Sequence, residues 1–264
     1  MKLEQLKQRY REDRRVKEIA DQFRDHPLSH LHLTGSSGSI NAFVAYGISK
    51  QIPLHQFFIL ADKEEAAYFL NDLETLVGEK ALFYPSSYRR AYEVEQTDNA
   101  NIQMRAEVLN KIAAKEQQYY VVSYPEALSE FVITEKKLHQ HKLEINQGDS
   151  LDMEFMIENL NEFHFERVDF VGEPGEFSVR GGILDVYSFA NEHPYRIEFF
   201  GDEVDSIRLF DAATQLSVKK LEGIAILPNV QEKMVEESRI PIFDFLPDNT
   251  LYWLKDFRLS RDAI

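Results

Sequence analysis

The sequence predicts an α/β protein, in which a parallel sheet has helices on both faces and an α+β domain is inserted into the chain. Over the first 130 residues, short apolar runs that read as buried strands alternate with helical patterns, which is typical of a parallel sheet. From about Thr134 the pattern changes to one helix followed by short strands and glycine-containing turns. We therefore expect a first domain at 1–130, an inserted domain at 131–228, and a return segment at 229–264 that completes the first domain.

The first domain is expected to open with an amphipathic helix over 1–25. A short strand over 29–34 follows, because two leucines alternate there with two histidines. A glycine-serine loop then leads into a helix that ends near Lys50. The other expected elements are strands at 57–60, 81–84, 119–123 and 250–254, and helices at 63–77, 101–115 and 125–131. Because no helix follows the last strand, we expect the chain to be the front part of a longer protein.

The inserted domain is expected to centre on an antiparallel β unit between residues 175 and 211. Alternation places Phe177 and Val179 on one face of a strand, with Ser178 and Arg180 on the other. Glycines interrupt the apolar runs where the chain must reverse, because glycine reaches positive φ without a steric clash.

Three further stretches of the inserted domain carry predictions. Residues 136–145 are polar and expected to be extended. A helix over 151–163 is expected to begin from a cap at Asp149 or Ser150. Residues 216–227 read as one more pair of strands.

Composition limits the function. The 264 residues include no cysteine, and the formal net charge is −15. The missing cysteines exclude disulfides and thiolate metal sites, so a reducing cytoplasm is the expected location. The negative charge disfavours nucleic acid as a partner, because it repels phosphate. No apolar run is long enough to span a membrane, so no membrane contact is expected.

The loop at Gly35, Gly38 and Ser39 stands where a phosphate-binding loop would, between a predicted strand and a helix. The pattern G-x-x-x-x-G-K-[ST] requires a lysine after its last glycine, but Gly38 is followed by Ser39 and the next lysine is Lys50. A magnesium-binding acidic pair would follow the last strand, and Lys255 stands there instead. We therefore interpret the loop as a degenerate, non-functional nucleotide site, with no ATP or Mg²⁺ bound by this segment.

No other catalytic or metal site is predicted. His30 and His32, like His139 and His141, could share a strand face, but neither pair has a third ligand at zinc spacing. No serine-histidine-aspartate order with a nucleophile elbow is present.

Arg167 and Arg180 stand out in an otherwise acidic region. One interpretation is structural, with Arg180 paired to the cross-strand Glu198 or Glu176 and Arg167 exposed at a strand end. The other is that both arginines belong to a docking surface for another protein. The residues alone favour the structural interpretation.

Five stretches of the chain resemble the UvrB family and the UvrB-homology module that begins the bacterial transcription-repair coupling factor family (Mfd). They are GEFSVRGGILDVYSF (175–189), YRIEFFGDEVDSIRLFD (195–211), FERVDF (165–170), FYPSSYRRAYE (83–93) and YYVVSYPEALSEF (119–131). The missing lysine after Gly38 makes the Mfd family the better match. The resemblance implies a degenerate RecA-like first domain and an inserted domain that binds the damage-recognition protein UvrA.

The resemblance also implies which residues meet UvrA. The arginine of the UvrB Y-x-R motif falls on Arg167, and the second arginine of its F-R-V-R-G motif falls on Arg180. The first arginine of that motif falls on Ser178, a departure that implies fewer charge contacts. On physical grounds, Phe177 and Leu184 are expected either to supply apolar surface around the arginines or to belong to the core.

For the parent protein, the resemblance implies an RNA-polymerase-binding domain and an ATP-driven DNA translocase beyond this chain. The segment itself is then an adaptor in transcription-coupled nucleotide excision repair. Its UvrA-binding surface is expected to be masked by the rest of the parent chain until the motor engages.

Two alternatives are carried forward. One is an atypical nucleotide-binding domain. The other is a DNA-binding domain like UvrB, for which Tyr88, Arg89, Arg90 and Tyr92 are a small candidate patch.

Overall fold

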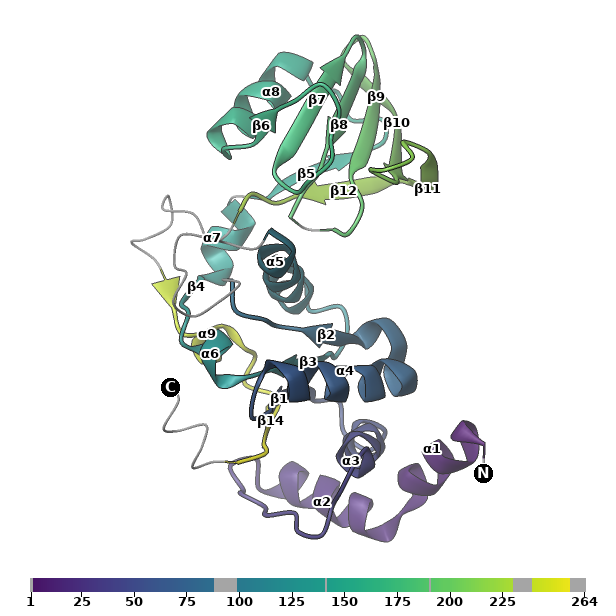
Figure 1. Cartoon of the computed structure of the whole chain (residues 1–264), viewed down its shortest axis with the longest axis vertical. Coiled ribbons are helices and arrows are strands. Elements are labelled where there is room, and N and C mark those ends of the chain that lie inside the picture. Colours follow the sequence, from purple (N-terminus) through teal and green to yellow (C-terminus); the bar gives the residue numbers. More distant parts are fainter. Residues whose placement is uncertain (1, 88–98, 141, 190, 230–238, 257–264) are drawn as a thin grey trace. The chain divides into compact units, whose positions relative to one another are not determined.

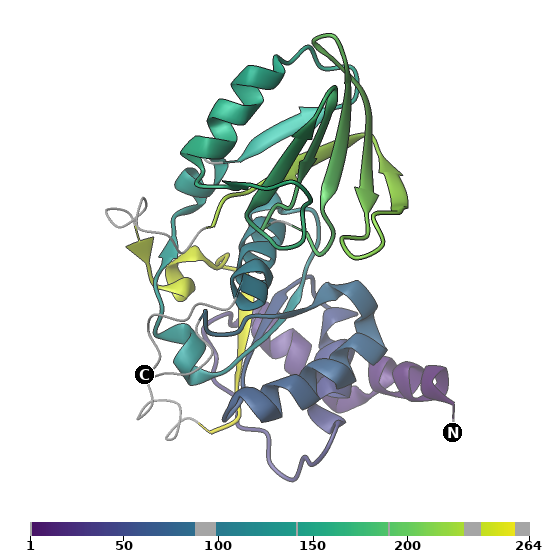
Figure 2. The ribbon, with the colours of Figure 1, turned by 45° about the horizontal axis from the view of Figure 1, so that its top comes forward.

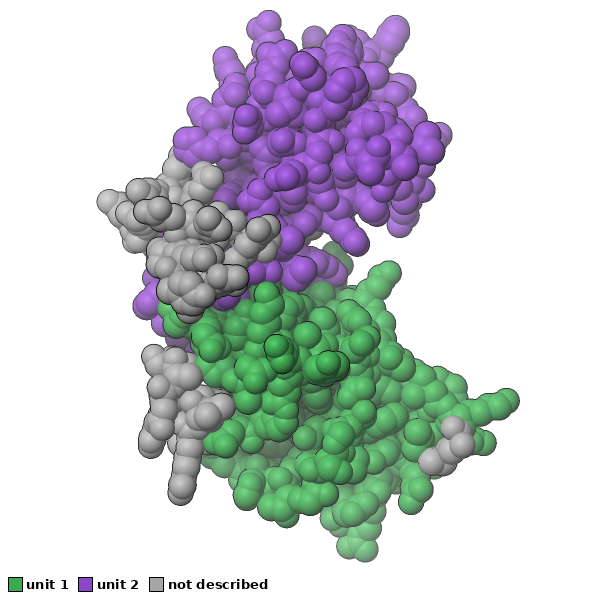
Figure 3. Space-filling model, in the orientation of Figure 1, with its two compact units in different colours: residues 1–85, 115–129, 246–264 green, residues 86–114, 130–245 purple. Residues whose placement is uncertain are grey.

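The structure is a computed structural model that describes residues 2–87, 99–140, 142–189, 191–229 and 239–256. The chain divides into two compact units, coloured separately in Figure 3. Unit 1 comprises residues 1–85, 115–129 and 246–264, and unit 2 comprises residues 86–114 and 130–245.

Unit 1 is built on a parallel sheet with the strand order β14-β1-β3-β2. These strands are β1 (His55–Ile59), β2 (Ala81–Phe83), β3 (Tyr120–Ser123) and β14 (Thr250–Leu254). Strand β14 pairs with β1 although about 195 residues separate them in the chain, and Figure 1 shows the yellow β14 beside β1. All five residues of β1 are buried, as the continuous apolar run predicts for a central parallel strand.

The described helices of unit 1 are at most 15 residues long. They are α1 (Leu3–Glu12), α2 (Arg14–Asp25), α3 (Ile40–Ser49), α4 (Lys63–Val77), the 3₁₀ turn η1 (Gly78–Lys80) and α6 (Pro125–Leu128). Buried residues of α2 and α3, among them Val16 and Ile48, form a core cluster against which Leu251 and Trp253 of β14 pack. Trp253 stacks on Phe58 of β1, with 5.5 Å between the ring centroids.

Helix α4 has the predicted bounds because both of its ends are marked in the sequence. The Asp62 carboxylate accepts a hydrogen bond from the Glu65 backbone N–H at 2.8 Å, which satisfies an amide that has no partner within the helix. Gly78 follows the last turn with a φ of +60°, a conformation that glycine adopts at little cost.

Two predictions in unit 1 are wrong. Residues 29–34 form no strand, and Leu31 and Leu33 are 45% and 38% exposed. No described strand pairs with this segment, and alternation without ladder hydrogen bonds does not stabilise a strand. The single helix expected over 1–25 is two helices, because Asp13 leaves the helical conformation (φ −59°, ψ 129°) and its carboxylate caps α2.

Unit 2 carries a six-stranded mixed sheet with the order β11-β10-β9-β8-β7-β6, shown from a second direction in Figure 2. The strands are β6 (Glu166–Arg167), β7 (Glu176–Arg180), β8 (Ile183–Val186), β9 (Tyr195–Phe200), β10 (Glu203–Phe210) and β11 (Ser217–Leu221). One face of this sheet is apolar and buried, as the predicted alternation requires. Its residues include Phe177, Leu184, Ile197 and Ile207.

The rest of unit 2 comprises the 16-residue helix α5 and several short elements. They are α5 (Asn99–Ala114), β4 (Val132–Ile133), α7 (Glu135–Gln140), β5 (Leu143–Asn146), α8 (Met153–Glu162), β12 (Gly223–Ile226), β13 (Arg239–Ile240) and α9 (Ile242–Phe245). Strand β12 pairs antiparallel with β5, and β13 with β4. The strands predicted over 216–227 are present, but they pair with β10 and β5 rather than with each other.

Two predictions in unit 2 are also wrong. Residues 136–145 are not extended throughout, because α7 occupies their first half with Leu138 buried. His139 therefore lies on a helix, while His141 falls outside the described residues. The cap of α8 is Asp152, whose carboxylate accepts from the Glu154 N–H at 2.8 Å, and neither Asp149 nor Ser150 has this role.

The fold class is confirmed: a parallel α/β sheet with helices accompanies a separate α+β unit. The domain bounds 1–130, 131–228 and 229–264 stay a prediction. No helix in the described part of the chain is long and apolar enough to cross a membrane.

Candidate protein-interaction site

The face of the six-stranded sheet opposite its buried core is polar, and we call it the polar face. Antiparallel pairing aligns Ser178 with Asp185, Asp185 with Arg196, and Arg196 with Arg208. Directly paired residues point to the same side of a sheet. The register therefore gathers these polar and charged side chains, which are far apart in sequence, into one row across β7 to β10.

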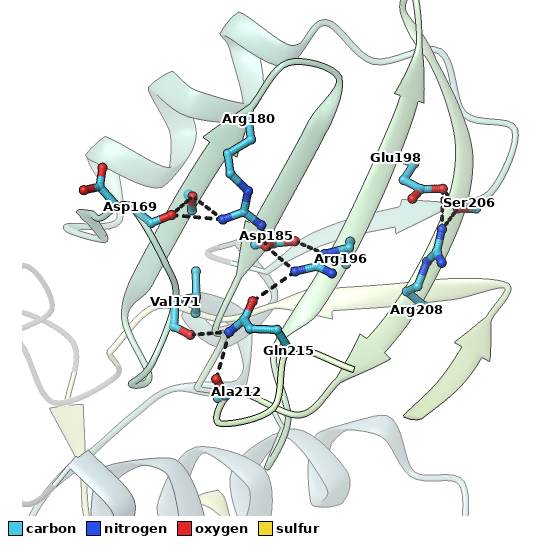
Figure 4. Close-up of polar contacts among 11 residues, drawn as sticks. Asp169, Val171, Arg180, Asp185, Arg196, Glu198, Ser206, Arg208, Ala212 and Gln215 are labelled. Carbon is cyan, nitrogen blue, oxygen red and sulfur yellow. Dashed lines mark hydrogen bonds and ion pairs between the residues drawn. The ribbon is translucent and has the colours of Figure 1, made fainter. Parts of the chain in front are cut away.

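Asp185 is the centre of this row. Its side chain is 0% exposed, and its carboxylate accepts two hydrogen bonds from Arg196, at 2.7 Å from Nε and 2.8 Å from Nη2. Arg180 Nη2 donates to the same carboxylate (Figure 4). A buried carboxylate is tolerated when it is paired in this way. The hydrogen bond to Asp185 also raises the pKa of Arg196.

Arg180 is held but not covered. Its Nη1 donates to the Asp169 carbonyl at 2.9 Å and to the Ser178 hydroxyl at 3.1 Å, and its side chain remains 35% exposed. Its guanidinium lies 5.0 Å from the centroid of the Phe170 ring. The expectation that Arg180 pairs with Glu198 or Glu176 is wrong, because Arg180 reaches diagonally across the strand pair to Asp185, which lies opposite Ser178.

Those two glutamates are engaged elsewhere. Glu198 accepts a hydrogen bond from the Ser206 hydroxyl at 2.7 Å and pairs with Arg208, and these contacts lower its pKa. Glu176 accepts from the backbone amides of Gly172 and Glu173, at 2.7 and 2.8 Å.

Arg167 is the second predicted arginine. It lies in β6 at the edge of the sheet, pairs in parallel register with Phe177, and is exposed. None of the described residues forms a hydrogen bond or ion pair with its guanidinium, so its charge is available at the surface.

Phe177 and Leu184 do not belong to this surface. Both side chains are 0% exposed, and they project from the face of the sheet opposite Ser178 and Asp185. The expectation that they supply apolar surface around the arginines is therefore wrong, and the alternative that both belong to the core is correct. The apolar side chain beside Arg180 is Phe170, which is 66% exposed.

The degenerate nucleotide loop lies in unit 1. Gly35 and Gly38 have φ of +75° and +56°, and Ser39 precedes α3 without a side-chain cap. Gly38 lines a cavity of about 240 Å³ together with the aromatic rings of β1 and β14 and three charged side chains. Those charged side chains are Glu65, Asp72 and Lys255.

The charges in this cavity do not suit a phosphate. Lys255 Nζ forms an ion pair with Glu65, so its charge is already neutralised. The other Glu65 oxygen accepts from the Ala61 backbone N–H at 3.1 Å. Asp72 adds a negative charge, which repels phosphate oxygens. No group of three or more metal-ligating side chains occurs within the described residues.

Residues 143–231, which include all strands of the polar face, match the family described as the UvrB interaction domain. This part of the chain is thus similar to the UvrB interaction domain.

Its relatives are transcription-repair-coupling factors and UvrB proteins. That of Bacillus subtilis (strain 168) is 30% identical over 202 residues, which cover 76% of this chain and 17% of the relative. That of Escherichia coli (strain K12) is 34% identical over 125 residues, or 47% of this chain and 10% of the relative. UvrABC system protein B of Vibrio parahaemolyticus is 28% identical over 204 residues, or 72% of this chain and 30% of the relative. The family resemblance predicted from the motifs is confirmed, and the chain spans only a small part of these relatives.

Proposed function

We propose that this chain is the adaptor module of a transcription-repair coupling factor and that it recruits UvrA through the polar face of unit 2 together with the exposed edge strand β6. The observation that carries the proposal is the match of residues 143–231 to the UvrB interaction domain. The relatives named transcription-repair-coupling factor and UvrABC system protein B support a role in transcription-coupled nucleotide excision repair.

Arg167 and Arg180 are the proposed contacts with UvrA. Arginine offers a planar fork of donors that suits a partner carboxylate, and it is enriched among interface hot spots. Arg167 is exposed at an edge strand, and Arg180 is fixed by three groups yet partly open to solvent. A fixed side chain loses little conformational entropy when it binds.

Ser178 supports this arrangement in an indirect way. Its hydroxyl donates to the Asp169 carbonyl at 2.8 Å and accepts from Arg180. The serine that replaces an arginine of the UvrB motif therefore helps to position Arg180.

We also propose that this segment is not an enzyme and works without ATP or Mg²⁺ in the cytoplasm. The ion pair between Lys255 and Glu65 and the negative charge of Asp72 support the absence of a nucleotide site. In the parent protein, ATP-driven DNA translocation, contact with RNA polymerase and masking of the polar face by other domains are assigned to regions outside this chain. The candidate DNA-contacting patch at 88–92 lies outside the described residues.

The test is a binding titration of the whole chain against cognate purified UvrA, followed by calorimetry. We expect a saturable complex that Arg167→Glu weakens at least tenfold, whereas Arg14→Glu on the exposed face of α2 leaves it unchanged. A parallel titration with a fluorescent ATP analogue and Mg²⁺ is expected to show no saturable binding. A wild-type chain that is folded but binds no UvrA would refute the adaptor role, and tight Mg²⁺-dependent nucleotide binding would favour the nucleotide-binding alternative.

A further inference from the structure

Phe170 is a large apolar side chain on the surface that no packing requirement explains. It lies in the loop between β6 and β7 and is 66% exposed. Its ring faces the guanidinium of Arg180 at 5.0 Å, within the range of a cation–π contact. Phe170 and Arg180 thus present an apolar ring and a positive charge side by side.

The loop that carries Phe170 is fastened on both sides of the ring. Before it, the Asp169 carbonyl accepts from the Ser178 hydroxyl at 2.8 Å and from Arg180 at 2.9 Å. After it, Val171 is buried, and the two amides of Gly172 and Glu173 donate to the Glu176 carboxylate. The backbone on both sides of the ring is therefore fixed, a condition that reduces the entropy lost on binding.

Arg180 keeps both charge and donors for a partner. A guanidinium has five N–H donors, and the contacts to Asp169, Ser178 and Asp185 account for three of them. Asp185 is already paired in bidentate fashion with Arg196, so two positive groups share one carboxylate. The excess positive charge lies at Arg180, the more exposed of the two arginines.

We propose that Phe170 and Arg180 form one anchor for UvrA, in which the ring enters an apolar pocket and the guanidinium pairs with a carboxylate at the rim of that pocket. This inference rests on the proposed UvrA-binding function and adds to it a contact residue, Phe170, and the chemistry of the matching surface. Aromatic residues and arginine that are close together and shielded from water are the typical hot spots of interfaces. Binding would remove water from the ring and from the charge pair together, which strengthens the electrostatic attraction.

The experiment is a double-mutant cycle on the whole chain, with cognate UvrA as the titrant. Phe170→Ala and Arg180→Ala are each expected to raise the dissociation constant tenfold or more. The double variant is expected to raise it by less than the product of the two single fold-changes. The matched control is Phe200→Ala, because Phe200 is an equally large side chain of the same unit that is 83% exposed, at the end of β9. It is expected to bind within about twofold of wild type. Thermal unfolding of every variant checks that the fold is retained.

The outcomes separate the two proposals. If wild type binds and Arg180→Ala weakens binding while Phe170→Ala behaves like Phe200→Ala, the anchor is refuted and the adaptor function stands. If the two single effects simply multiply, Phe170 and Arg180 do not act as one anchor. If folded wild type does not bind UvrA at all, both proposals fail.

Discussion

Arg196 in β9 donates two hydrogen bonds, of 2.7 and 2.8 Å, to the carboxylate of Asp185 in the adjacent strand β8. This bidentate pair neutralises the buried carboxylate, so Arg180 is a third member whose charge is not needed to stabilise Asp185. The same pair explains how an aspartate can stand within the apolar strand β8, between Leu184 and Val186.

Asp185→Asn is expected to destabilise the protein by about 3 kcal/mol, because it leaves two arginines without their buried counter-charge. Urea denaturation followed by circular dichroism measures the change. Asp169→Asn is the control, since Asp169 contributes only its backbone carbonyl to the network, and it is expected to stay within about 0.5 kcal/mol of wild type. Equal stability of the two variants would contradict the central role of Asp185.

Arg180→Ala is expected to leave the fold intact with a loss of about 1 kcal/mol, because Arg196 still pairs with Asp185. Arg180→Glu is expected to cost about 2 kcal/mol more, since it places a second carboxylate beside a buried one. Charge reversal at this position therefore disturbs folding as well as binding, and alanine is the cleaner probe of the interface. Chemical denaturation measures the loss of stability in both variants. Identical denaturation midpoints would show that a negative charge at position 180 does not destabilise Asp185.

His55 is expected to make unit 1 less stable in mild acid. Its imidazole is buried at the start of β1, and burial lowers its pKa below 6.5. Below pH 6.5 the unfolded chain therefore binds a proton that the folded chain does not, so stability falls as the pH falls toward the folded pKa, by at most about 1.4 kcal/mol per pH unit. Thermal unfolding at pH 7.5 and 5.5 is expected to show a larger decrease in Tm for wild type than for His55→Gln. An equal decrease in both proteins would assign the pH dependence to other groups.

The two glycines between β7 and β8 are expected to differ in tolerance. A Cβ at Gly182 would lie 2.9 Å from the Phe199 carbonyl oxygen, whereas Gly181, with φ of +61°, has open space around it. Gly182→Ala is therefore expected to destabilise the sheet by about 2 kcal/mol, because a backbone atom must move. Gly181→Asn is expected to cost well under 1 kcal/mol, because asparagine tolerates the left-handed region. Denaturation midpoints of the two variants test this order.

The sequence predicts the parallel sheet and helix α4 well because their signals are local. Apolar runs mark β1 and β3, while Asp62 and Gly78 mark the ends of α4. The failed strand over 29–34 shows the limit of such signals, since a strand also needs a partner that alternation does not reveal.

The network of Asp185, Arg180 and Arg196 could not be predicted from local patterns, because it also depends on which strands pair. Alternation alone places Ser178 and Arg180 opposite Phe177, but only the register brings Asp185 and Arg196 to them. A charge inside the apolar run ILDV was the one available sign that a buried pair exists. Phe170 lies in a loop without periodicity, so nothing in the sequence separates an exposed ring from a core residue there.

The distant origin of β14 has a consequence for synthesis on the ribosome. The edge strand of unit 1 is translated only after all of residues 130–245, although its partner β1 emerges near the beginning. The parallel sheet of unit 1 therefore has only its strands β1, β2 and β3 while residues 130–245 are synthesised. During that time unit 2 can fold. Until β14 is synthesised, Phe58 lacks the Trp253 ring that stacks on it. Chaperones or proteases that recognise exposed apolar side chains on nascent chains can act during that time.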